Sequence, residues 1–140
     1  MQIQPIFQSV GKLLEGRLFH IPEYQRAYSW QTQHREDLFR DIRKVSASGS
    51  DSTHFMATIV GLRRAKKSIA ADEFIEIEVV DGQQRLTTLI ILLKALTKAL
   101  EHENAKYAKE INAQLVKGDD LSLLLLQTNH DASHIFIDYI

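Results

Sequence analysis

Five consecutive residues, Asp81-Gly82-Gln83-Gln84-Arg85, bring together side-chain types that suit a phosphate group. A guanidinium such as that of Arg85 grips phosphate oxygens through two parallel hydrogen bonds, and the amides of Gln83 and Gln84 both donate and accept. The carboxylate of Asp81 suits a hydrated Mg²⁺ ion. An alternative needs no ligand, since Asp81 would cap a helix whose exposed first turn holds the glutamines and the arginine. The residue types alone leave both interpretations open.

The spacing of apolar residues changes at this segment, so it joins two different elements. Before it, apolar and acidic residues alternate over 75–79, which predicts a strand with one buried face. After it, apolar residues recur at helical spacing over 86–100, and the apolar run 89–93 predicts a helix deep in the core. Gly82 stands at the sharp turn. Such a junction points unpaired N–H groups and the positive end of the helix dipole outward, which favours an anion.

A second segment, residues 23–30 (EYQRAYSW), contains a similar pair of side chains. Gln25-Arg26 repeats the glutamine–arginine pair of the first segment in a stretch without regular periodicity. Aromatic side chains in a loop usually pack that loop onto the domain, and we expect this of Tyr28 and Trp30.

Four cations follow a mostly apolar strand that the sequence predicts at 54–62, near the centre of a sheet. They are Arg63, Arg64, Lys66 and Lys67. A polar bend then leads into the strand near Phe74, so the spacing predicts a hairpin with a basic tip. Such a tip is either an ordinary solvated loop or a contact for the DNA backbone.

The rest of the chain predicts further helices and short strands. Helices are expected at 3–14, from Ser29 or Thr32 to about Val45, at 102–117 and from His134, with strands at 18–21 and 121–126. The second helix should bury Leu38, Phe39, Ile42 and Val45. His130 and His134 have the i, i+4 spacing of a metal pair, but His130 precedes the expected helix cap, so no metal site is predicted there.

Composition bounds the class of protein. The 140 residues fit one domain, and 44% hydrophobic with 25% charged residues is typical of a soluble globular protein. The absence of cysteine excludes disulfides, thiolate catalysis and zinc sites with cysteine ligands. No apolar run is long enough for a bilayer and no signal peptide is evident, which predicts a cytoplasmic protein without membrane contact. The net charge of −1 means that any DNA contact comes from a local patch.

Three segments together resemble a known family. IPEYQRAYSW (21–30), HFMATIV (54–60) and VVDGQQRLTTL (79–89) are similar to the N-terminal domain of GmrSD-type, modification-dependent (type IV) restriction endonucleases. Ala57 stands where that family usually has glycine. The family is similar to the ParB/sulfiredoxin-like superfamily. The resemblance implies an α/β (α+β) domain, a small mixed sheet packed by helices, with the strand, DGQQR turn and buried helix at its centre.

The resemblance also implies an activity for the matching residues. The family binds and hydrolyses a nucleoside triphosphate, GTP or ATP with Mg²⁺, and couples this to cutting modified foreign DNA in phage defence. By position, the nucleotide-binding residues are Gln25, Arg26, Asp81, Gly82, Gln83, Gln84 and Arg85. Arg26 and Arg85 would stabilise phosphate charge and Asp81 would hold the metal. Either Gln25 or Gln84 would position the attacking water.

Two further expectations concern the whole enzyme and a different class of function. The family's nuclease usually lies in a separate C-terminal HNH-type domain, and the helical pattern of 135–140 stops half-made, so we expect residues 1–140 to be the N-terminal domain of a longer chain. The alternative is a DNA-binding or modified-DNA sensor module without catalysis, which contacts DNA through the four cations of 63–67.

Overall fold

The described residues form four helices and four strands, and the strands join in one sheet. The computed structural model describes residues 3–22, 24–25, 28–49, 58–69, 71–116 and 126–128. In order, the elements are α1 (Val10–Leu14), β1 (Arg17–Ile21), α2 (Thr32–Ala47), β2 (Val60–Ile69), β3 (Asp72–Asp81), α3 (Gln83–Leu100), α4 (Ala105–Leu115) and β4 (Leu126–Thr128).

The sheet of the described residues is mixed, with strand order β2-β3-β1-β4. β3 runs antiparallel to β2 and parallel to β1, and β1 runs parallel to β4. The register between β1 and β3 places Leu18 beside Glu76 and His20 beside Glu78. A small mixed sheet packed by helices confirms the predicted α/β (α+β) class.

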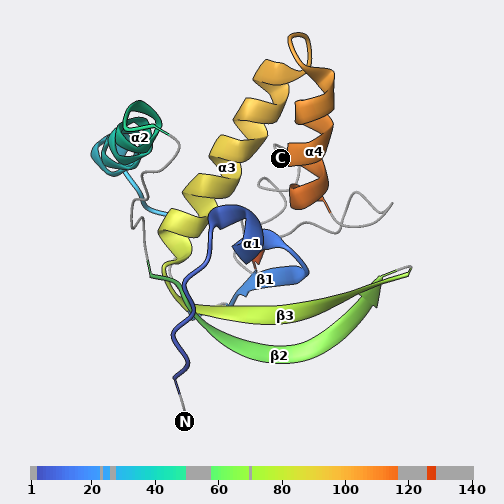
Figure 1. The fold of residues 1–140 in the computed structure, drawn as a ribbon. Coiled ribbons are helices and arrows are strands. Elements are labelled where there is room, and N and C mark those ends of the chain that lie inside the picture. The colour runs from blue at the N-terminus through green and yellow to red at the C-terminus, as the bar shows by residue number, and fades with distance from the viewer. Residues whose placement is uncertain are drawn as a thin grey trace.

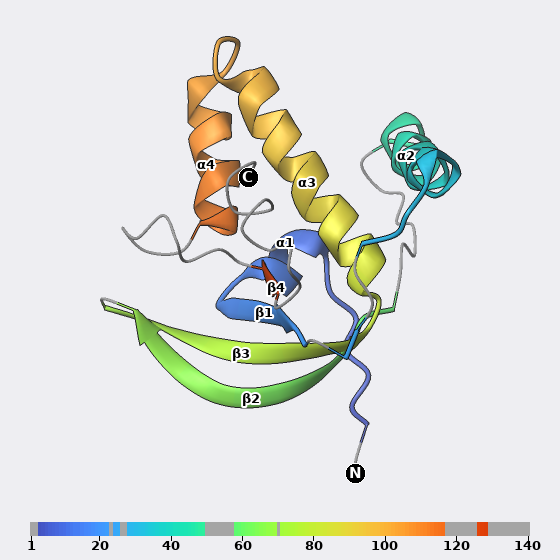
Figure 2. The same ribbon diagram turned by 180° about the vertical axis from the view of Figure 1, so that it is seen from behind.

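The core lies between the sheet and three helices. Its buried cluster takes side chains from α1, β1, β3, α3 and α4, namely Leu14, Phe19, Ile21, Val79, Leu86, Ile90 and Leu115. α3 and α4 form an antiparallel pair above the strands, and α2 lies on the side of α3 away from α4 (Figure 1). The reverse view shows β4 beside β1, at the edge of the sheet opposite β2 (Figure 2).

The predicted strand–turn–helix junction is confirmed at Gly82. β3 ends at Asp81, α3 begins at Gln83, and Gly82 between them has φ +90°. Gly82 is the N-cap of α3, and no side chain caps this helix. The interpretation of Asp81 as the helix cap is therefore wrong, because the left-handed turn at Gly82 separates the carboxylate from the first turn.

The hairpin is confirmed, but its basic tip is not. β2 and β3 pair over their whole lengths, with an irregularity between Arg63 and Lys66, so the four cations lie along β2 and the turn follows Ile69. β2 is also an edge strand of the described sheet, not the central strand predicted at 54–62, of which only 58–62 lie within the described residues. Carboxylates on β3 form ion pairs with cations of β2 across the two strands. These ion pairs favour continued pairing of β2 with β3 through the charged segment.

Several helix boundaries differ from those predicted. α1 is confined to Val10–Leu14 because the Ser9 hydroxyl accepts a hydrogen bond from the Lys12 backbone and begins the helix there. α2 begins after Gln31, which forms a capping box with His34, and neither Ser29 nor Thr32 is the cap.

The buried side of α2 also differs in part from the prediction. Leu38 is buried, Ile42 and Val45 are half-buried, and Phe39 is 38% exposed. The helix that follows α3 is shorter than predicted because Asn104 caps α4. The predicted strand at 121–126 lies outside the described residues except for Leu126, and the expected helix from His134 and the His130–His134 pair lie wholly outside them.

We predict that Gly82→Ala destabilises the fold through both conformation and contact. A Cβ at this position would lie 2.9 Å from the Thr58 carbonyl oxygen and 3.3 Å from the Ile59 Cα atom, at a φ of +90°. We expect a loss of about 2 kcal/mol or more in the free energy of unfolding, measured by urea denaturation. The matched control is Gly49→Ala, because Gly49 has φ +88° with no atom within 4 Å of the added Cβ. Equal losses in the two variants would contradict the contact with Thr58.

Candidate functional site

The two segments with glutamine–arginine pairs lie against each other. The Gln25 Nε2 atom donates to the Val80 carbonyl at 2.8 Å, and the Gln83 Nε2 atom donates to Gln25 Oε1 at 3.1 Å. Both ends of the Gln25 amide are therefore engaged, one with the end of β3 and one with the first residue of α3. The sequence predicted both segments, and the structure shows that they meet.

A second set of contacts continues along the same loop. The Ser29 backbone N–H donates to Gln84 Oε1 at 2.9 Å, and the Tyr28 hydroxyl lies 2.9 Å from Thr88 Oγ1. Thr88 donates its one hydroxyl proton to the Gln84 carbonyl at 2.8 Å, so the Tyr28 hydroxyl is the donor to Thr88. The predicted packing of this loop onto the domain is confirmed.

Arg85 and Trp30 form the charged contact between the segments. The guanidinium carbon of Arg85 lies 5.8 Å from the centre of the Trp30 ring, within the range of a cation–π interaction. The Trp30 ring also stacks on the His34 ring at 5.7 Å between centroids. These contacts join the first turn of α3 to the first turn of α2, which explains why α2 stands beside the N-terminus of α3 (Figure 1).

The first turn of α3 is more buried than we expect if Gln83, Gln84 and Arg85 are ordinary exposed surface residues. Gln83 and Gln84 are only 9% and 7% exposed, and Arg85 is half-buried. The interpretation in which the two glutamines lie on an exposed first turn is therefore wrong. Asp81 is exposed at the end of β3, beside Val60 of β2. Arg26 lies outside the described residues.

The described ranges contain no group of three or more histidine, aspartate or glutamate side chains placed to hold a metal ion. A metal ion at Asp81 would therefore take its other ligands from a bound phosphate and water, which is how Mg²⁺ is often held. In the same described ranges, no helix is both long and apolar enough to cross a membrane.

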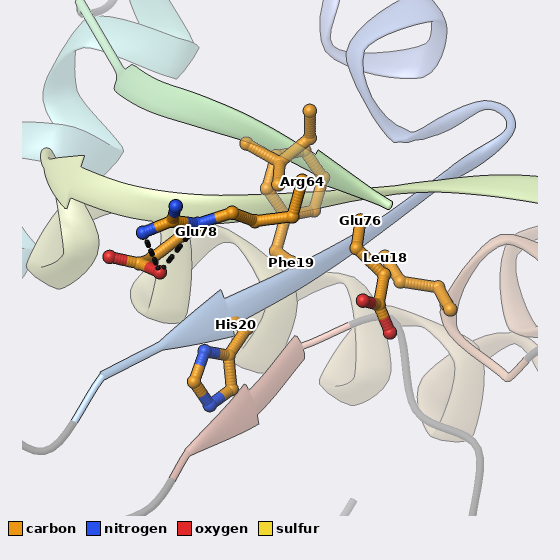
Figure 3. A pocket seen from close by; sticks show the side chains of 7 residues that line it. Leu18, Phe19, His20, Arg64, Glu76 and Glu78 are labelled. Atoms are coloured by element: carbon orange, nitrogen blue, oxygen red, sulfur yellow. Dashed lines mark hydrogen bonds and ion pairs between the residues drawn. The ribbon is translucent and has the colours of Figure 1, made fainter. Parts of the chain in front are cut away.

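A shallow pocket of about 220 Å³ lies on the sheet away from the DGQQR turn (Figure 3). Its lining includes Leu18 and His20 of β1, Arg64 of β2, and Glu76 and Glu78 of β3. None of the motif residues lines it. The alternation of acidic and apolar residues along β3 placed both glutamates on one face, but only the tertiary structure shows which groups face them.

Glu78 connects this pocket to the segment that holds Tyr24 and Gln25, which we call the glutamine–arginine loop. Arg64 Nε donates to Glu78 Oε2 at 2.9 Å, as Figure 3 shows, and the Tyr24 hydroxyl donates to Glu78 Oε1 at 3.0 Å. The hydrogen bond from Arg64, followed by that from Tyr24, lowers the pKa of Glu78 below its ordinary value of 4.5. The same carboxylate raises the pKa of Tyr24, because it accepts the proton that ionisation would remove.

The four cations of β2 differ in their partners. Arg64 pairs with Glu78, and Lys66 pairs with Glu73 at 2.6 Å. Arg63 and Lys67 are exposed and form no ion pair with any other residue in the described ranges. Half of the predicted DNA-contacting cations are therefore already matched by carboxylates of the neighbouring strand.

Comparison with known proteins identifies a family. A family model described as "GmrSD restriction endonuclease, N-terminal domain" matches residues 6–138, which is nearly the whole chain. No curated protein matches the chain.

We predict that Glu78 contributes to the free energy of unfolding at neutral pH and that this contribution is lost at acid pH. Its pKa is lower in the folded protein, so its contribution is fully present above the unfolded pKa and is lost as pH falls through the folded pKa. Glu78→Gln should therefore be less stable than wild type at pH 7, and the difference should shrink as pH falls below about 4.5. Urea unfolding at pH 7, 5 and 3.5 measures this. Glu76→Gln, on the same face of β3, is the control, and a gap for Glu78→Gln that does not vary with pH would contradict the assignment.

Proposed function

Since this chain belongs to the family of GmrSD restriction endonuclease N-terminal domains, we propose that it is the nucleoside-triphosphate-binding module of such an enzyme. The family makes the chain part of a restriction endonuclease. In our proposal the nucleotide is GTP or ATP with Mg²⁺. Its hydrolysis regulates DNA cleavage by a separate nuclease domain.

One observation carries the proposal: hydrogen bonds hold Gln25 against the turn where β3 ends and α3 begins. The hydrogen bonds from Gln25 to Val80 and from Gln83 to Gln25 hold it there. This places both glutamine–arginine segments at the N-terminus of an 18-residue helix. The first N–H groups of such a helix and its dipole favour a phosphate group. A second segment beside that end supplies further groups for a ligand.

The arginines carry the phosphate charge in this proposal. Arg85 extends from the first turn of α3, where its guanidinium offers planar, bidentate recognition of phosphate oxygens. Arg26 follows Gln25 directly in the sequence and is the second proposed phosphate ligand. Charge that spreads over the phosphate oxygens during hydrolysis is stabilised by such fixed cations.

Asp81 is the proposed ligand of Mg²⁺. A single exposed carboxylate at the end of β3 fits this ion, which commonly takes one or two carboxylates, with phosphate oxygens and water as its other ligands. When bound, Mg²⁺ would neutralise phosphate charge. Asp81 holds it directly or through a water molecule, and Asp81 directly precedes Gly82, the N-cap residue of α3.

Gln25 and Gln84 are the proposed residues that position the attacking water. Both amides already hold the loop, because Gln25 bridges Val80 and Gln83 while Gln84 accepts from Ser29. An amide has two N–H donors and two acceptor lone pairs, so Gln25 keeps both of these hydrogen bonds while it also orients a water. This ties hydrolysis to the arrangement of the loop.

We predict that Arg85→Ala weakens nucleotide binding by about a hundredfold or more, because it removes a charged partner of the phosphates. The free energy of unfolding should fall by only about 1 kcal/mol, since Arg85 is half-buried and a cation–π contact such as that with Trp30 contributes about this much. Titration calorimetry with GTP and with ATP, each with Mg²⁺, measures the affinity. A phosphate-release assay over four nucleoside triphosphates, with and without modified DNA, measures turnover.

The control for Arg85→Ala is Arg43→Ala, which removes an exposed arginine from α2. Equal nucleotide affinities in wild type and Arg85→Ala would show that Arg85 is not a phosphate ligand.

A second candidate function is DNA binding through β2 without catalysis. The exposed cations Arg63 and Lys67 on an edge strand support it, because they have no ion-pair partner in the described part of the chain. A phosphate backbone is the partner that a row of such cations suits best.

If β2 binds DNA, the double variant Arg63→Ala, Lys67→Ala should bind a duplex less tightly. The slope of log affinity against log salt should become shallower by about two, one for each lost phosphate contact. Lys106→Ala, Lys109→Ala removes the same charge from exposed positions on α4 and is the control. Fluorescence anisotropy with a labelled duplex between 50 and about 200 mM salt covers the useful range. Identical slopes in the two double variants would exclude β2 as the DNA contact.

A further inference from the structure

Trp30 contacts Arg85 through its aromatic ring, whereas the glutamine amides join the two segments through hydrogen bonds. We propose that Trp30 is a positioning residue for Arg85, whose ring holds the guanidinium in the direction from which it meets a phosphate group. This inference rests on the proposed nucleotide site and adds a residue that neither glutamine–arginine pair contains.

The geometry is that of a cation held through its face. The Arg85 guanidinium carbon lies 5.8 Å from the centroid of the Trp30 ring, and tryptophan is the ring that attracts a cation most strongly. In a cation–π contact the charge is attracted to the π face of the ring, so the ring supplies no oxygen or nitrogen acceptor for the guanidinium N–H donors. The contact therefore orients Arg85 without competing for the hydrogen bonds that recognise phosphate oxygens.

A comparison with Arg64 shows why a ring suits this task. Arg64 is held by the Glu78 carboxylate, with contacts at 2.7 and 2.9 Å, and its positive charge is matched by that partner. The Trp30 ring carries no net charge, so it holds Arg85 without cancelling the charge that attracts an anion. Two arginines in the same domain thus contact different groups, Arg64 a carboxylate and Arg85 an aromatic ring.

Trp30 can act as a platform because it is itself fixed on several sides. Its ring stacks on His34 with an interplanar angle of 27°, and its carbonyl accepts a hydrogen bond from Arg35 Nη1 at 2.8 Å. The preceding Ser29 N–H donates to Gln84, the neighbour of Arg85 in α3. The platform is therefore tied both to α2 and to the turn that carries Arg85.

Fixing Arg85 in advance strengthens binding through entropy. A free arginine side chain has many rotamers, and a ligand that orders it must overcome that loss. With Trp30 in place, part of the order exists before the phosphate arrives. Removing the ring should therefore weaken binding even though Trp30 itself does not contact the phosphate.

The test compares Trp30→Leu, which removes the aromatic face, with Trp30→Phe, which keeps a ring. Calorimetric titration uses GTP, ATP and inorganic pyrophosphate, each with Mg²⁺. We expect Trp30→Leu to bind about three- to thirtyfold more weakly than wild type and Trp30→Phe to recover most of that loss. Urea unfolding of both variants confirms that they fold. If Trp30→Leu does not fold, the comparison of Trp30→Phe with wild type and the fluorescence signal decide.

Intrinsic fluorescence gives a readout that a purely structural role would not produce. Trp30 is the only tryptophan of the chain, so its emission reports on this contact alone. Emission of the wild type should change on saturation with pyrophosphate, and Arg85→Gln should abolish that change. An unchanged emission at a pyrophosphate concentration that calorimetry shows to be saturating would overturn the inference.

The two proposals fail in different ways. If wild type binds nucleotide and Trp30→Leu binds it equally well, Trp30 does not position Arg85, while the proposed nucleotide site stands. If wild type binds neither nucleotides nor pyrophosphate, the proposed site is wrong and the inference about Trp30 is wrong with it.

Discussion

The left-handed turn at Gly82 is the constraint on which the rest of the site depends. It converts the central strand β3 into α3 within one residue, and it brings that residue so close to the backbone of Thr58 and Ile59 that no side chain fits. The turn places Gln83 and Gln84 in the buried first turn of α3 and leaves Asp81 exposed at the end of β3. The groups on either side of Gly82 therefore take separate roles, one set inside the domain and one carboxylate outside it.

Glutamine is well suited to the junction between the loop and this turn. A buried polar group costs free energy unless it is hydrogen-bonded, and an amide supplies a donor and an acceptor without a net charge. Gln25 uses both ends of its amide, one toward Val80 and one toward Gln83. Carboxylates at these positions would accept but not donate, and would add negative charge next to a proposed phosphate site. Neutral amides fix the loop, and the positive charge there comes from arginine.

The sheet has its own electrostatic organisation. The edge strand β2 carries four cations, of which Arg64 and Lys66 pair with glutamates on β3. Charged residues on an edge strand also discourage pairing with another sheet, so these cations have a structural value whether or not DNA binds there. Glu78 belongs to both regions, since Arg64 and Tyr24 donate to its two oxygens. The pocket on the sheet and the glutamine–arginine loop are thus joined by one carboxylate.

The sequence by itself determined the features that arise from neighbouring residues. The change of apolar period at Gly82 predicted the strand, the turn and the helix, but of the apolar run 89–93 only Leu89 and Ile90 are buried and Ile91 is exposed. The aromatic residues predicted a loop packed on the domain. Local patterns carry this information because the period of a strand or helix and the φ angle of a glycine are local properties. The same patterns failed for the cations at 63–67, because the length of the β2–β3 ladder depends on partners across the hairpin.

Only the tertiary structure decided which side chains meet. Gln25 bonds to Val80, 55 residues away, and Tyr24 to Glu78, 54 residues away. The contacts of the Trp30 ring with Arg85 of α3 and with His34 of α2 likewise join separate helices. No local period encodes such pairs, since they depend on how β1, β3 and α3 are placed around a common core. The sequence therefore contained the components of the site, and packing around that core decided how they are joined.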